Sequence, residues 1–167
     1  MLYNNIESNL RSILSAKSIC DVSLLDSDQL VLVKSLVQKE IDDMITNDIK
    51  ISYKDISFGK HVIKSYNKEN GTATITTASQ VSYYYESNGK DKKYGNLKKG
   101  TIYICEFIYV YDEAKFEKSD KTIAVNCKNC GAPLKGLDGG TCAYCGTYSK
   151  PINLKAWKIA SYKEDWR

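Results

Sequence analysis

The residues of this chain best suited to chemistry are four cysteines in two Cys-x-x-Cys pairs, within "CKNCGAPLKGLDGGTCAYCGT". Two residues between cysteines let the chain turn back, so that both sulfurs face one ion. A glycine follows each pair, where the turn requires a positive φ. Because four thiolates leave no coordination position for water, we expect a structural Zn(II) site. Its ligands would be Cys127, Cys130, Cys142 and Cys145.

Other uses of the cysteine pairs are less compatible with the sequence. The N-terminal segment lacks a basic region, and Glu7 and Arg11 interrupt its apolar positions, so it does not resemble a signal peptide. We therefore expect a cytoplasmic protein, where disulfides are rare. A redox Cys-x-x-Cys would sit at a helix start in a βαβ unit, which the pattern does not predict. Iron of the rubredoxin type uses the same four ligands, and the spacing does not separate it from zinc.

The remaining candidates for chemistry are few. Cys105 lies inside an apolar segment and is expected to be a small buried hydrophobe. Cys20 has no base nearby in the sequence, and His61, the only histidine, is expected at a surface or sheet edge. No phosphate-binding loop or hydrolase motif occurs. The sequence therefore predicts no catalytic and no cofactor-binding residues, and no enzyme.

The composition is that of an ordinary globular domain. The 167 residues are 43% hydrophobic and 26% charged, with a net charge of +4. This balance of charge does not favour nucleic-acid binding. No segment reaches the roughly 20 apolar residues that a membrane-spanning helix needs.

Helical periodicity dominates the first third of the chain. Asn4 or Asn5 is expected to cap a first helix that breaks at 18–23. A second helix is expected to begin near Asp26 or Ser27 and to end near Asn47. The apolar positions of the two helices are Ile6, Leu10, Ile13 and Leu14, then Leu30, Val33, Val37, Ile41 and Met44.

From Ile49 onward the apolar residues alternate, which is typical of strands. Asn70-Gly71 predicts a hairpin turn. "TIYICEFIYVY", 101–111, is β-branched and aromatic on both faces, so we expect it in the middle of the sheet. A last strand is expected at 156–166, with alternation placing Trp157, Ile159 and Ser161 on one face and Lys158, Ala160 and Tyr162 on the other.

These elements predict an α+β fold in which two N-terminal helices pack on a curved, cone-like antiparallel sheet. The zinc ribbon would be inserted before the last strand. We divide the chain into an N-terminal helical segment, 1–24, an α+β domain, 25–126 with 146–167, and the inserted ribbon, 127–145.

The segment from Leu30 to Trp166 resembles the zinc-ribbon version of the bacterial Tim forty-four-like domain family, named after a mitochondrial inner-membrane translocase subunit. The resemblance rests on the two cysteine knuckles, a closing strand with Trp157, and a strand pattern made by Tyr103, Glu106, Phe107, Tyr109 and Val110. It implies a cone-shaped fold like that of nuclear transport factor two, interrupted by a ribbon. The chain departs from the family in its first knuckle, Cys-Lys-Asn-Cys rather than Cys-Pro-x-Cys, and in lacking an N-terminal membrane segment.

We therefore expect a non-enzymatic, zinc-binding interaction or scaffold module, linked by the resemblance to transport or membrane-associated assemblies. The alternatives are a carrier of a small apolar ligand in the cone and, less favoured, an enzyme that uses the same cavity. A protein partner is expected and nucleic acid is not. The loop Gly89–Lys99 carries five lysines, so weak peripheral contact with an anionic membrane is a further alternative to a solvated loop.

Overall fold

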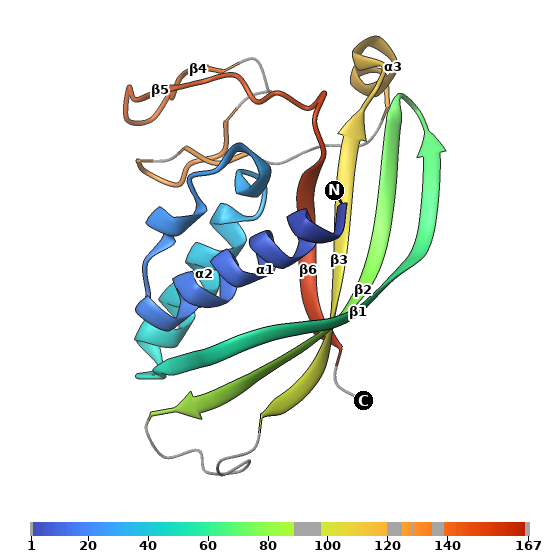
Figure 1. Cartoon of the computed structure of the whole chain (residues 1–167). Helices are drawn as coiled ribbons and strands as arrows, with labels where there is room; N and C mark the ends of the chain where they lie inside the picture. The colour runs from blue at the N-terminus through green and yellow to red at the C-terminus, as the bar shows by residue number, and fades with distance from the viewer. Residues whose placement is uncertain (1, 89–97, 120–124, 128, 135–138, 166–167) are drawn as a thin grey trace.

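The computed structural model describes residues 2–88, 98–119, 125–127, 129–134 and 139–165. Among these residues, four helical elements precede the four-stranded sheet that forms the body of the molecule, and one short helix lies between two of its strands in the sequence (Figure 1). The helical elements are α1 (Leu2–Ile19), η1 (Val22–Leu25), η2 (Asp28–Leu30), α2 (Lys34–Thr46) and α3 (Glu113–Glu117). The strands are β1 (Ile51–Glu69), β2 (Thr72–Ser87), β3 (Lys99–Val110), β4 (Gly140–Thr141), β5 (Tyr148–Ser149) and β6 (Lys158–Asp165).

The main sheet is antiparallel, in the order β1-β2-β3-β6. The expected α+β class and the central position of the 101–111 strand are confirmed. The four cysteines lie between β3 and β6 in the sequence, as expected, yet these two strands are neighbours in the sheet. Our division of the chain into three parts stays a prediction.

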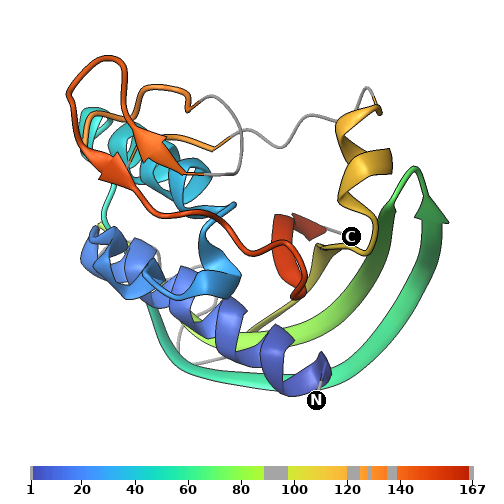
Figure 2. The same cartoon turned by 90° about the horizontal axis from the view of Figure 1, so that it is seen from above.

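The sheet is strongly bent around the helices, as the view from above shows (Figure 2). Three irregularities in the β1–β2 pairing lie at 54–57, 58–61 and 63–65. Such bulges add a residue on one strand and bend it. They lie within β1, a single strand of 19 residues that begins at Ile51. The predicted Asn70-Gly71 turn closes the hairpin, and both residues have positive φ.

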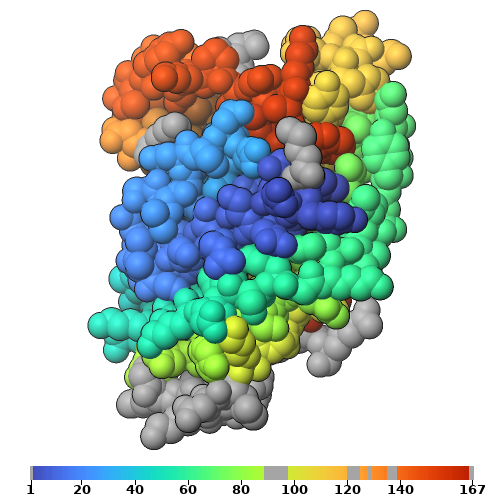
Figure 3. Space-filling view, in the orientation of Figure 1, coloured from blue at the N-terminus to red at the C-terminus, as the bar shows by residue number. Residues whose placement is uncertain are grey.

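The core lies between the concave face of the sheet and the helices. The predicted apolar face of α1 is fully buried there, as are Leu30, Val33, Val37 and Ile41. From the sheet, the buried members of this cluster are Val81, Tyr83, Tyr103, Cys105, Phe107, Ile159 and Tyr162. The space-filling view shows β1 wrapped closely around α1 (Figure 3). One continuous core therefore joins the N-terminal segment to the sheet.

Hydroxyl groups and charges are also built into this core. Tyr83 donates to Glu164 at 3.0 Å, and the Lys99 ammonium, only 3% exposed, lies 2.9 Å from the same carboxylate. Tyr162 donates to Glu40 at 2.5 Å. Buried polar groups are stable only when they are hydrogen-bonded, and these are. Lys99 is therefore part of the core and not of a solvated loop, whereas Gly89–Leu97 of that loop lie outside the described residues.

The second helix does not begin where the sequence predicted. The chain at 28–30 forms a 3-10 turn, and α2 starts only at Lys34. Of the two predicted caps, Asp26 binds Lys34, and Ser27 precedes η2 without a side-chain capping hydrogen bond. Asp28, the first residue of η2, binds Lys158 of β6. The predicted cap of the first helix is also wrong, because α1 begins at Leu2 and places Asn4 and Asn5 inside its first turn.

The predicted alternation along the last strand is wrong as well. Ile159 pairs with Phe107 and Ser161 pairs with the adjacent Glu106, so Ala160 is an extra, bulged residue. The bulge places both Ile159 and Tyr162 in the core, while Ser161 is exposed. Alternation assumes an unbroken ladder, and one inserted residue reverses the face of everything beyond it.

We expect that burial of the core tyrosines makes the fold sensitive to alkali. Burial raises the pKa of Tyr53, Tyr83, Tyr103 and Tyr162 far above the ordinary value of about 10. The unfolded chain therefore loses protons first, so the stability is complete below about pH 10 and falls as the pH rises further. A pH titration followed by tyrosinate absorbance and circular dichroism should show the buried tyrosines ionising only as the fold is lost.

A Tyr53→Phe variant should lose stability less steeply with pH, because one ionisation is removed. Ionisation of every tyrosine near pH 10 in a chain that keeps its native circular dichroism would contradict the prediction.

The bulge in β6 makes a second prediction. Ile159→Ala should lower the free energy of unfolding by about 2–5 kcal/mol, because it leaves a cavity in the core. Ser161→Ala, which simple alternation would place on the same face, should change it by no more than about 0.5 kcal/mol. Denaturant unfolding of both variants measures the difference, and equal costs would argue against the bulge.

Candidate metal centre

Two turns of similar geometry present the four cysteines. In the first, the Gly131 amide donates to the Cys127 carbonyl at 2.9 Å; in the second, the Gly146 amide donates to the Cys142 carbonyl at 3.0 Å. The two glycines have φ of +71° and +73°. Only glycine adopts this conformation without strain, so the Cys-x-x-Cys-Gly sequence itself folds each turn.

A small hairpin holds the second turn and ties it to the returning chain. β4 and β5 pair through Gly140 with Ser149 and Thr141 with Tyr148. Gly139, with φ of +73°, lies so close to the chain beyond β5 that an added Cβ would be 2.6 Å from the Ser149 carbonyl oxygen. This close contact requires a glycine at 139. The connecting residues 135–138 lie outside the described residues.

The four sulfurs lie within 4.8 Å of one another. Cys127 Sγ is 3.6 Å from Cys145 Sγ, and Cys130 Sγ is 3.7 Å from Cys142 Sγ. A tetrahedral site with metal–sulfur bonds of about 2.3 Å needs sulfurs about 3.8 Å apart. A disulfide needs about 2.05 Å, and all four cysteines are free. The separations fit four thiolates around one ion.

Hydrogen bonds favour the thiolate form at two of the four sulfurs, those of Cys142 and Cys145. The side chain and amide of Thr147 lower the pKa of Cys145 to about 5, and the amides of Cys145 and Tyr144 lower the pKa of Cys142. The Ala132 amide lowers the pKa of Cys130 too, but the neighbouring sulfurs, Cys145 foremost, outweigh it and raise the value to about 12. A divalent cation at the centre would favour the thiolate form of all four ligands, because a coordinating thiol loses its proton.

The other two cysteines do not join the cluster. Cys105 is fully buried in β3, where burial raises the pKa of its thiol to about 12, in agreement with the prediction of an inert hydrophobe. Cys20 is exposed at the end of α1.

His61 makes two contacts that no sequence pattern indicated. His61 Nδ1 lies 2.9 Å from Ser79 Oγ, and Nε2 lies 3.0 Å from a Glu7 carboxylate oxygen. The Ser79 hydroxyl, the His61 imidazole and the Glu7 carboxylate are linked in the order found in the catalytic triad of serine hydrolases. Ser79 is fully buried, however, where no substrate could reach it. The contacts instead fasten the start of α1 to edge strand β1. Because these residues are far apart in the sequence, no local signal could have predicted the cluster.

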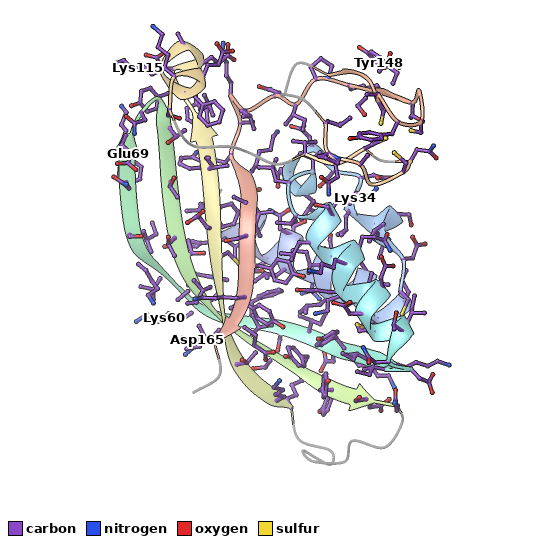
Figure 4. The ribbon with its side chains drawn as sticks, turned by 180° about the vertical axis from the view of Figure 1, so that it is seen from behind. Lys34, Lys60, Glu69, Lys115, Tyr148 and Asp165 are labelled. Atoms are coloured by element: carbon purple, nitrogen blue, oxygen red, sulfur yellow. The ribbon has the colours of Figure 1, made fainter. Side chains whose placement is uncertain are left out.

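A cleft of about 1030 Å³ separates the ribbon from the helical elements. One wall comes from η1, η2 and α2, and the other from the cysteine turns and the chain on either side of β4–β5. Viewed from behind, Lys34 lies where the two walls approach each other (Figure 4).

No protein-family model, no curated protein and no solved structure matches the chain. The resemblance to Tim forty-four-like domains thus stays a prediction. Among the residues that the structure describes, no helix combines the length and the apolar character needed to cross a membrane.

We predict about one equivalent of Zn(II) per purified chain, bound by the four thiolates. Cys142→Ser should abolish stoichiometric binding and speed amide hydrogen exchange in residues 139–149, because metal binding and local folding are coupled. Exchange in β2 and β3 should change little, since the core lies elsewhere. Elemental analysis and exchange mass spectrometry measure the two effects.

Cys20→Ser is the matched control, since Cys20 is exposed and outside the cluster. A fully folded ribbon without metal, or two disulfides in its place, would contradict the prediction. Faster exchange throughout the sheet of Cys142→Ser would show that ribbon and sheet unfold as one unit.

Proposed function

We propose that this protein is a non-enzymatic interaction or scaffold module whose ribbon is stabilised by Zn(II), in the manner that the resemblance to Tim forty-four-like domains implies. The observation that carries the proposal is the closed set of four sulfurs at separations suited to a tetrahedral ion. Four protein ligands leave no position for a substrate or an activated water, so the metal would have a structural role.

The cone-like fold is part of the same proposal. It is supported by the strong bend of the sheet and by the enclosure of α1 and α2 on its concave side (Figure 2). It is also supported by the insertion of the ribbon between two neighbouring strands.

The carrier and enzyme alternatives receive less support. Tyrosine side chains and the two helices fill the concave side of the sheet, where an apolar ligand would lie. Two carboxylates that reach that region, Glu40 and Glu164, are engaged by tyrosine hydroxyls. Contact with an anionic membrane also receives little support from the described lysines of the loop, because Lys98 binds Asp55 and Lys99 binds Glu164.

The proposal predicts that partner binding depends on the metal. Affinity purification after in-cell crosslinking should recover the same specific proteins with wild type and with Cys20→Ser, and lose them with Cys142→Ser. The reason is that an unfolded ribbon no longer presents its surface. Recovery of the same proteins by Cys142→Ser would contradict a metal-stabilised interaction module, and so would a catalytic turnover that survives removal of the metal.

A further inference from the structure

We propose that the cleft between the ribbon and the η1–η2–α2 segment binds an extended, near-neutral peptide segment of a partner protein. This inference rests on the proposed interaction function and adds the surface and the class of ligand. At about 1030 Å³ the cleft has the size of a ligand-binding site, and it lies between two parts of the chain, where such sites are common.

An orphaned hydroxyl is the observation that points to a ligand. Ser149 lines the cleft, is only 7% exposed, and its Oγ has no hydrogen-bond partner among the residues that the structure describes. Buried polar groups are nearly always paired, so an unpaired one needs a specific explanation. Its cross-strand neighbour is Gly140, which has no side chain to reach it. The oxygen itself has almost no accessible surface, so a change of the Ser149 side-chain rotamer would turn it toward the cleft, where a polar group of a bound ligand would complete this bond.

The ion pairs on the walls of the cleft argue against a highly charged ligand. Lys34 binds Asp26, and the buried ammonium of Lys158, behind the wall, binds Asp28. Asp42 accepts a hydrogen bond from Gln38 at 2.8 Å and lies one helical turn from Lys39. The negative and positive charges on the walls of the cleft therefore nearly cancel. A nucleic acid or an anionic lipid headgroup would need an excess of positive charge, which these walls do not offer.

The remaining lining favours a peptide over a small apolar molecule. The lining combines apolar side chains such as Val31, Pro133 and Ile152 with polar ones such as Ser35, Asn129 and Thr141. A peptide backbone supplies donors and acceptors at regular spacing, while its side chains supply apolar surface. The short β4–β5 hairpin also belongs to the type of structure against which extended peptides pair.

The test uses a phage-displayed library of random linear peptides, selected on the zinc-loaded protein of residues 1–167. Enriched sequences are synthesised, and their affinities are measured by fluorescence anisotropy. Ser35→Arg and Ala143→Arg place a large charged side chain into the cleft from opposite walls, and each should weaken binding by about tenfold or more. The matched controls are Ser12→Arg on α1 and Ala114→Arg on α3, which lie outside the lining and should bind as wild type does.

Ser149→Ala separates a ligand role from a structural one. A merely structural hydroxyl would lower the melting temperature when removed. An orphan that serves a ligand should leave the melting temperature unchanged or raised while weakening the peptide by about three- to tenfold. Affinity should also change little between low and high salt, because the walls are nearly neutral.

Peptides that bind the two arginine variants as tightly as wild type would overturn the cleft as the site, while leaving the interaction function standing. The absence of any enriched peptide, or a steep loss of affinity with salt, would overturn the peptide proposal too. Failure of the proposed function would appear separately, as metal-independent recovery of partners by Cys142→Ser.

Discussion

The pairing of β3 with β6 is the constraint on which the rest of the structure depends. These strands are neighbours, although α3 and the whole ribbon lie between them in the sequence. The chain leaving β3 must therefore return to the same end of the sheet. The Val110 amide donates to the Leu154 carbonyl at 2.9 Å, and Phe116 packs with both residues. Closing a long loop costs conformational entropy, and a metal that ties the loop internally lowers that cost.

A buried ion pair also determines the position of η2. Lys158, at the start of β6, has no exposed surface and binds Asp28 of η2. A buried ammonium is stable only beside its partner, so the position of β6 determines that of η2. Leu30 and Val33, which follow, are then held in the core, and α2 begins only after them. One ion pair therefore links the closing strand to the helical wall of the cleft.

The sequence was sufficient wherever the signal was local. The apolar face of α1 depends on a helical period, the Asn70-Gly71 turn on backbone preference, and the four-cysteine cluster on spacing within each turn. The sequence did not predict features that depend on contact with a residue far away in the chain. The bulge at Ala160 depends on β3, and the burial of Lys99 depends on Glu164. A pattern within one segment carries no information about the residues that contact it across the sheet. The bulge, the burial of Lys99 and the cleft could therefore not be predicted.

The two proposals meet in the wall that the ribbon gives to the cleft. Cys127 and Cys130, two of the four sulfur-bearing residues, also line it. A ribbon this small has little core of its own, since its large aromatic side chain, Tyr144, is mostly exposed. Its shape therefore depends on the ion more than on packing. On these proposals the metal would also maintain the cleft. It would hold the first cysteine turn in place, on the side of the cleft opposite α2.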